Sequence, residues 1–441
     1  MKPKIVFFSR AYQEVLFPLL QSDKYDSIHI TLTVKEKKYI EKKGFKVDFC
    51  FETYNKSVDR VHSSYLYSSY LSDRFLNKHK ITKRLKILKK EISFWAEILE
   101  TYKPIAIINE QVAIEISEVL YIEAKKRNIH YKAWMTNPVN GYFYWVSNPM
   151  SLSLDDAVFL KTPSYDLTQL AETYTKKIIE KNERPYYLTP YLNQNKYRNI
   201  LSASKGLLKL CLNVIFGSSN AYEDNKTAAI NYFERSLKTF FVKYNTISDF
   251  AEYEVILYPL HYEPEASLAY LSEFFSNQIA LIENISKCLG VNQVLVVKEH
   301  PAQAGMLLTK KYQELYKNTS CLYYLPSSII SYDIIKKTDL IITLTSHLGW
   351  EALILGKPVY LLGKMFYDKY PFINKFTSFE NLRTEIRKKS YIYPTKESVI
   401  KFISQLLEYS YKGMPFPNEE LYEEQNLKNI VFAIESELGL N

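Results

Sequence analysis

A lysine and a histidine stand two residues apart where a short apolar run ends, in Lys298-Glu299-His300-Pro301 after Val294–Val297. Because side chains alternate along a strand, Lys298 and His300 are predicted on one side and Glu299 on the other. The compact charge of an ammonium group beside the directional N–H donor of an imidazole suits a phosphate. The alternative is that His300 only ends the strand and Lys298 is solvated.

A second polar segment, Thr345-Ser346, lies between an apolar run and the start of a helical pattern. Hydroxyls and backbone N–H groups at the positive end of a helix dipole favour an anion. Gly349 would allow close approach of backbone or ligand. The Glu351 carboxylate, about one turn further, could accept hydrogen bonds from the two neighbouring hydroxyls of a ribose. A capping role for Ser346 is the alternative, and it is compatible with ligand binding.

His261 leaves another apolar run beside two carboxylates, Glu263 and Glu265. A histidine flanked in this way could act as a general acid or base, or contact an acceptor sugar. Glu265 is the predicted substrate contact of this segment. A structural role for His261 in the turn between Pro259 and Pro264 is the alternative.

In the first half of the chain, Glu110 follows the apolar run Ile105–Asn109 and is the preferred candidate for a catalytic base or nucleophile. Its alternative is a helix N-terminal glutamate favoured by the dipole. Ser9 and Arg10, after Lys4–Phe8, are further candidates for binding substrate. The seven histidines are dispersed, without HExxH or Asp-x-Asp spacing, so neither a metal nor another cofactor is expected.

The elements that must position these residues alternate between strand-like and helix-like segments, which predicts parallel α/β layers. In such a doubly wound, Rossmann-like sheet, ligands bind at the carboxyl ends of the strands. The strands expected in the second half are Glu254–Leu257, Val294–Val297, Leu322–Leu325, Leu340–Thr345 and Pro358–Leu362, and the helices include Pro264–Leu289, Ala302–Tyr316, Ser328–Lys336 and His347–Leu355.

The 441 residues favour two domains. We expect an N-terminal Rossmann-like domain with a helical insertion at 1–250 and a C-terminal Rossmann-like domain at 251–400. Helices at 401–441 are expected to cross back to the first domain.

The net charge of +9 comes without a zinc-finger, RNA-recognition or helix-turn-helix signature, so nucleic acid is not an expected partner. Attraction to anionic substrates or to a membrane surface is expected instead. The four scattered cysteines, without a CxxC pair, indicate a reducing compartment. No apolar run is long enough for a signal peptide or a membrane span. We therefore expect a cytoplasmic protein, with peripheral contact at the inner membrane left open.

At these strand exits the sequence resembles the bacterial capsule polysaccharide biosynthesis family, which includes retaining β-Kdo transferases. The resemblance is carried by YPLHYEPE at 258–265, KEHP at 298–301 and TLTSHLGWEALILGKPVYLLG at 343–363. It implies a GT-B glycosyltransferase, with two Rossmann-like domains facing across a cleft and the nucleotide on the C-terminal one. The first half matches only in its α/β character.

Members of this family use CMP-activated 3-deoxy-ulosonic acids such as Kdo. The His-Pro pair also resembles one in bacterial sialyltransferases that contacts the CMP phosphate. By this resemblance His300, Thr345 and Ser346 hold the phosphate, and Glu351 contacts the ribose. The expected function is transfer of Kdo or a related nonulosonic acid from a CMP donor to a glycan or glycolipid acceptor, in capsule or lipopolysaccharide synthesis. Retention or inversion stays open.

Three alternatives remain. The first is a UDP-sugar transferase or a UDP-N-acetylglucosamine 2-epimerase-like enzyme. The second is a poly(glycerophosphate) transferase, although these tend to show Asp-Tyr-Ser-Ser where this chain has Thr-Ser-His-Leu-Gly-Trp-Glu. The third is a membrane-associated scaffold built on the basic helices Ile81–Leu99 and Lys205–Phe216, which predicts vesicle binding without nucleotide binding.

Overall fold

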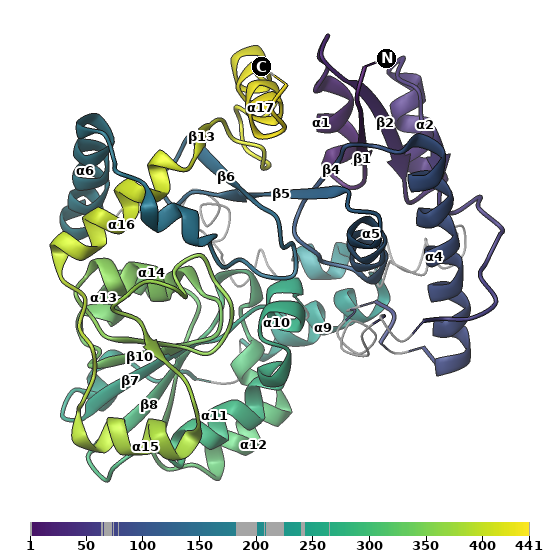
Figure 1. Ribbon diagram of the computed structural model, residues 1–441. Helices are drawn as coiled ribbons and strands as arrows, with labels where there is room; N and C mark the ends of the chain where they lie inside the picture. Colours follow the sequence, from purple (N-terminus) through teal and green to yellow (C-terminus); the bar gives the residue numbers. More distant parts are fainter. Residues whose placement is uncertain are drawn as a thin grey trace. The chain divides into compact units, whose positions relative to one another are not determined.

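The computed structural model describes residues 2–62, 65, 73, 75–77, 79–181, 201–206, 208, 225–239, 243–263 and 265–440. The chain divides into two compact units (Figure 1): unit 1 comprises Met1–Ala171 and Lys401–Asn441, and unit 2 comprises Glu172–Ile400. The described residues between 172 and 250 therefore belong to unit 2, whereas the sequence predicted a first domain at 1–250. Most of the expected helix Lys205–Phe216 lies outside the described residues.

The contacts of two helices explain this difference. In α6 (Tyr165–Lys181), the backbone carbonyl of Ile179 accepts a hydrogen bond from the Tyr332 hydroxyl of unit 2. In α9 (Asn225–Lys238), the backbone at Arg235 lies so close to Gly305 that a side chain at that glycine would clash with it. Both contacts tie the middle of the chain to the C-terminal sheet.

Unit 1 is built on one sheet in the order β13-β6-β5-β4-β1-β2-β3. The strands β1 to β5 run parallel, and β6 and β13 are antiparallel additions at one edge. The order reverses between β1 and β4, so a topological switch point lies there. The strands are β1 (Lys4–Phe8), β2 (Asp26–Thr31), β3 (Phe49–Cys50), β4 (Ala106–Asn109), β5 (His130–Thr136), β6 (Tyr142–Val146) and β13 (Tyr411–Lys412); the helices include α1 (Gln13–Leu19), α2 (Val34–Lys42), α4 (Ile81–Tyr102), α5 (Glu115–Lys126), α16 (Lys396–Glu408) and α17 (Glu424–Glu437).

Unit 2 carries a fully parallel sheet in the order β12-β11-β10-β7-β8-β9, the strand order 3-2-1-4-5-6 of a doubly wound domain read from the other edge. The expected α/β fold class, with a Rossmann-like parallel sheet in each of two domains, is thus confirmed for both units. The elements are β7 (Glu254–Pro259), α10 (Ala266–Leu271), α11 (Gln278–Ser286), β8 (Gln293–Lys298), α12 (Lys310–Lys317), β9 (Leu322–Leu325), α13 (Ser331–Lys336), β10 (Leu340–Thr343), α14 (His347–Ile354), β11 (Val359–Leu361), β12 (Asn374–Lys375) and α15 (Phe379–Lys388).

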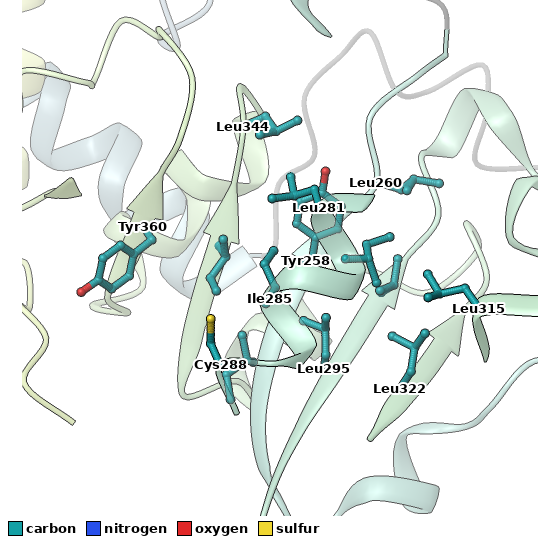
Figure 2. Close-up of a cluster of buried hydrophobic side chains, with 14 of the residues drawn as sticks. Tyr258, Leu260, Leu281, Ile285, Cys288, Leu295, Leu315, Leu322, Leu344 and Tyr360 are labelled. Carbon is teal, nitrogen blue, oxygen red and sulfur yellow. The ribbon is translucent and has the colours of Figure 1, made fainter. Parts of the chain in front are cut away.

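The core of unit 2 follows from its sequence pattern. Strands buried on both faces appear as continuous apolar runs, and every residue of β8 is buried. Alternate side chains such as Tyr258 and Leu295 meet Leu281 and Ile285 of α11 in one cluster (Figure 2). Figure 1 shows α13 and α14 on the opposite face of the sheet from α11 and α15.

The expected helix Pro264–Leu289 is interrupted. It consists of α10, a 3₁₀ turn at Glu273–Phe275 and α11. The Asn277 side chain accepts a hydrogen bond from the backbone N–H of Ala280 and so caps a new helix, whose first residue is Gln278. None of the helices in the described part of the chain is long and apolar enough to cross a membrane.

Candidate functional site

Three polar segments leave neighbouring strands at the switch point of the unit 2 sheet. β7 lies between β10 and β8, so the segments after these three strands emerge at one edge. They contain His261, Lys298 with His300, and Thr345 with Ser346. In open α/β sheets this edge is where ligands bind.

Lys298 and His300 lie on the same side of the β8 exit, as their spacing predicts. Lys298 is 3 % exposed, and its charge, after burial, lowers the pKa of His300 to about 4. The Nδ1 atom of His300 accepts a hydrogen bond from the backbone N–H of Ala302 (3.2 Å), so the proton of the neutral ring lies on Nε2. His300 is therefore a neutral N–H donor beside a buried ammonium group.

Glu299 points the other way, as alternation predicts. Its carboxylate accepts hydrogen bonds from the backbone N–H groups of Gly305 (3.1 Å) and Leu307 (2.9 Å). Burial raises the pKa of this carboxyl group. Glu299 thus fixes the loop after β8 and takes no part in the polar edge.

Thr345 and Ser346 follow β10, but their backbone N–H groups are already used. The N–H of Thr345 donates to His261 Nε2 (2.9 Å), and that of Ser346 donates to Thr343 Oγ1 (3.3 Å). The Ser346 hydroxyl caps α14 by accepting from the N–H of Leu348 (3.1 Å). The expectation of free amides here is wrong for these two residues, and the Thr345 hydroxyl, buried without a hydrogen-bond partner, is the group left for a ligand.

His261, a candidate acid or base in the sequence, is a buried residue in the structure. It is 4 % exposed, and burial lowers its pKa to about 3, with a smaller lowering from the neighbouring His300 whenever that ring is protonated. Its backbone is held by Gln278, whose side chain accepts from the His261 N–H (2.8 Å) and donates to the His261 carbonyl (3.1 Å). The imidazole links the β7 exit to the β10 exit.

A network of buried amides, which the sequence did not reveal, joins the same loops. The Gln278 amide also donates to the Glu263 carboxylate, which accepts from the Tyr312 hydroxyl (3.2 Å) as well. The Gln303 side chain accepts from the Glu263 N–H (3.0 Å) and donates to the Glu263 carbonyl. Gln303 belongs to the turn after His300, so the β7 and β8 exits are bonded to each other.

The remaining candidates of unit 2 have different surroundings. A Cβ atom on Gly349 would lie 2.5 Å from the Tyr367 hydroxyl and 2.9 Å from Thr343 Cγ2, so this glycine makes room for protein rather than for a ligand. Glu351 is partly exposed on α14, one turn after its start. Glu265 is partly exposed at the N-cap position of α10.

In unit 1, Arg10 follows β1 and Glu110 follows β4, on the two sides of the switch point. Their side chains form an ion pair, with Arg10 Nη2 2.7 Å from Glu110 Oε1 and exposed fractions of 11 % and 22 %. The Tyr131 hydroxyl donates to the Glu110 carbonyl (3.3 Å). A carboxylate and a guanidinium that remain reachable by solvent suit a site that binds polar substrate.

Ser9 is fully buried, and its hydroxyl lies 3.2 Å from His29 Nδ1, which corrects its expected role as a substrate contact. Two buried amides that the sequence did not reveal lie near the ends of β1 and β4. Asn109 precedes Glu110 and donates to the Tyr131 hydroxyl (3.0 Å), and Gln13 opens α1. A single Asn or Gln belongs to no sequence motif, so the positions of these two amides at the strand ends could be found only from the fold.

The chemistry available at these strand exits is the binding of an anion by the buried Lys298 ammonium group, by the neutral His300 ring and by the Thr345 hydroxyl. No group of three or more His, Cys, Asp or Glu that could hold a metal ion occurs within the ranges that the structure describes.

The sequence profile of a family described as capsule polysaccharide biosynthesis protein matches residues 217–389. The matched range contains the β7, β8 and β10 exits. The resemblance predicted from the three motifs is thereby confirmed for this part of the chain. Among curated proteins, none matches the sequence.

The chain is also similar to several solved structures at low identity. The beta Kdo 2,7 transferase of Thermosulfurimonas dismutans KpsC is 12 % identical over 99 % of both chains, with a TM-score of 0.38. The MnaA–UDP co-structure from S. aureus is 12 % identical over 100 % of this chain and 98 % of that one, with a TM-score of 0.32. The UDP-GlcNAc 2-epimerase from Neisseria meningitidis, bound to UDP-GlcNAc, is 15 % identical over both full chains, with a TM-score of 0.28.

Proposed function

We propose that the protein is a glycosyltransferase of bacterial capsule or related surface polysaccharide synthesis. The donor is a CMP-activated 3-deoxy-ulosonic acid, Kdo or a related nonulosonic acid, and the acceptor is a glycan or glycolipid at the cytoplasmic face of the inner membrane. The observation that carries the proposal is the convergence of three polar strand exits at the switch point of unit 2, within the range that matches the capsule family.

The donor chemistry agrees with the residues at this edge. A CMP-ulosonate carries a phosphodiester anion and a carboxylate, and the nucleotide leaves as a more highly charged phosphate. Lys298 supplies a positive charge with little exposure to water, where a charge acts most strongly. His300 Nε2 and the Thr345 hydroxyl supply directed hydrogen bonds to phosphate oxygens. Groups of this kind stabilise a departing phosphate more than the bound donor.

The transfer also needs a carboxylate, and we propose Glu110 of unit 1 for it. As a base, it would take the proton of the acceptor hydroxyl while that oxygen bonds to the anomeric carbon and the bond from this carbon to the phosphate oxygen breaks. As a nucleophile, it would bond to the anomeric carbon first, with release of CMP. The Arg10 guanidinium, with Nη2 2.7 Å from Glu110 Oε1, fixes the direction of this side chain.

Calorimetric titration of CMP and of UDP tests the donor assignment. The wild-type protein is expected to bind CMP more tightly than UDP. His300→Ala should weaken CMP binding by about 5- to 100-fold, which corresponds to a lost hydrogen bond to a charged group worth roughly 1–3 kcal/mol. His130→Ala is the control, because His130 is exposed at the start of β5 in unit 1.

The outcomes separate the candidate functions. Preference for UDP, with transfer or epimerisation of a UDP-sugar, would replace the CMP donor by the first alternative. Vesicle binding without binding of either nucleotide would favour the scaffold. Unchanged CMP affinity in the His300→Ala variant would remove the phosphate role of that residue.

A further inference from the structure

The imidazole of His261 holds the backbone of a distant segment in place by a hydrogen bond. Its Nε2 atom accepts the backbone N–H of Thr345, 84 positions further along the chain (2.9 Å). That bond requires an unprotonated Nε2, so the neutral ring carries its proton on Nδ1, which is buried. His261 therefore determines where the backbone turns at the end of β10.

Gln278 fixes His261 in turn. Its amide makes two hydrogen bonds with the His261 backbone, and its carbonyl oxygen accepts a third from the Tyr258 hydroxyl (3.0 Å). Gln278 is 1 % exposed, at the first position of α11, and Tyr258 lies in the core cluster of Figure 2 beside residues of the same helix. The β10 exit is thus connected to the hydrophobic core through two polar side chains.

We infer that His261 and Gln278 are positioning residues for the anion site, and that they act by holding Thr345 in place rather than by transferring protons or touching the sugar. The inference rests on the proposed function, since it concerns the same site. It develops the structural alternative that the sequence left open for His261, in place of the general acid or base role. It also gives Gln278 a role that neither the motifs nor the family match assigns.

The other partners of the network support this assignment. Besides His261, the Gln278 amide bonds Glu263, and Glu263 bonds Gln303 in the turn after His300. One connected set of buried groups therefore fixes all three strand exits that the proposed donor would contact. Breaking one of these hydrogen bonds would leave a donor or acceptor unsatisfied away from water, so the network favours the arrangement in which they are made.

The first test compares substitutions at position 261. Gln at this position presents a carbonyl oxygen at the end of a side chain that matches the reach of Nε2, whereas Leu presents no acceptor. His261→Gln is expected to keep CMP affinity within about threefold of the wild type and to keep the pH profile of kcat. His261→Leu is expected to lose about tenfold in CMP affinity, as for one hydrogen bond and the group it leaves unpaired.

The second test uses two glutamines of the same sheet. Gln278→Ala is expected to weaken CMP binding about tenfold. Gln293→Ala is the matched control. Gln293 is also buried, accepts from the Gly290 N–H (2.8 Å) and donates to Glu254 (3.0 Å), but it lies at the amino end of β8, away from the site. It should lower thermal stability to a similar extent and leave CMP affinity unchanged.

Hydrogen exchange at the Thr345 amide provides a readout that needs no nucleotide. This amide should be protected in the wild type and in His261→Gln, and exchange faster in His261→Leu and Gln278→Ala. If CMP does not bind the wild type but these exchange rates change as expected, the donor assignment fails and the positioning role stands. Unchanged exchange, or a His261→Gln variant that loses one limb of the kcat pH profile, would overturn the inference.

Discussion

Gly349→Ala distinguishes two reasons for a glycine in the motif around β10. If Gly349 lets a ligand approach the backbone, the substitution should reduce nucleotide binding and leave stability unchanged. In the structure the space is occupied by protein: an added Cβ atom would lie 2.5 Å from the Tyr367 hydroxyl and 2.9 Å from Thr343 Cγ2. We therefore expect the substitution to destabilise unit 2.

The size of the effect follows from what has to move. The Tyr367 ring is fully buried against Trp350 and Phe366, and its hydroxyl donates to the Ser346 carbonyl (2.6 Å). Overpacking in such surroundings costs about 1–3 kcal/mol. Loss of the hydrogen bond adds roughly 1 kcal/mol. The free energy of unfolding should fall by about 2–4 kcal/mol in total.

Urea unfolding followed by tryptophan emission measures this change, since Trp350 is the one tryptophan of unit 2. Gly290→Ala is the control: its Cβ would meet no atom closer than 3.4 Å, so its stability should stay within about 1 kcal/mol of the wild type. A Gly349→Ala protein with unchanged stability and lost CMP binding would refute the packing argument and restore the ligand-approach interpretation.

Three further substitutions test other parts of the structure. Glu110→Gln keeps a side-chain oxygen that can accept the hydrogen bond of Arg10 but removes the negative charge. Transfer activity should fall by at least about 10²-fold while the melting temperature stays unchanged. A variant with wild-type activity would exclude Glu110 as the catalytic base or nucleophile. Arg84→Leu breaks the buried pair with Glu115 and should cost about 3–5 kcal/mol. Burial raises the pKa of Glu115 to about 7, so more of this carboxyl group is ionised, and left without its partner by the substitution, at pH 8 than at pH 6. We therefore expect the loss of stability to be larger at pH 8. Equal shifts of the urea midpoint at the two pH values would contradict this. Because the pKa of His261 is lowered in the folded protein, the unfolded chain binds this proton first as the pH falls below 6.5. His261 should therefore contribute a loss of about 2–3 kcal/mol to the free energy of unfolding between pH 7.5 and 4.5, and His261→Gln should remove this contribution from the pH-dependent unfolding curve.

The elements of unit 2 could be predicted because parallel strands buried on both faces are continuous apolar runs. β8 and β10 begin or end within a few residues of their expected positions. The alternation of Lys298, Glu299 and His300 follows directly from such a strand. Once a strand is located, the side of the sheet on which each of its side chains lies can be predicted from the position in the strand alone, without knowledge of the tertiary fold.

Contacts between distant segments could not be predicted in the same way. Gln278 bonds His261 only because α11 begins at Gln278, and a continuous helix through 264–289 would have hidden that position. Similarly, Arg10 and Glu110 are 100 positions apart, and their pairing depends on β1 lying beside β4. The sequence identified the polar segments at the ends of strands, but not the buried amides that connect them.

The two histidines at the edge of unit 2 also share a feature that decides the charge of the site. His261 Nε2 and His300 Nδ1 each accept a backbone N–H, from Thr345 and Ala302 respectively. Protonation would turn each acceptor into a donor and break that bond, in addition to the cost of burying a charge. We therefore expect both rings to stay neutral when CMP binds, so that the positive charge beside His300 is that of Lys298.

Proton uptake on binding tests this expectation. Titrations of CMP at pH 6.5 in two buffers with different ionisation enthalpies give the number of protons taken up. Because CMP itself titrates in this range, the useful quantity is the difference between the wild type and His300→Ala. A neutral His300 predicts a difference near zero, even though the substitution weakens binding. If the wild type takes up an additional half proton or more, His300 becomes charged in the complex, and the hydrogen bond from Ala302 does not hold it neutral.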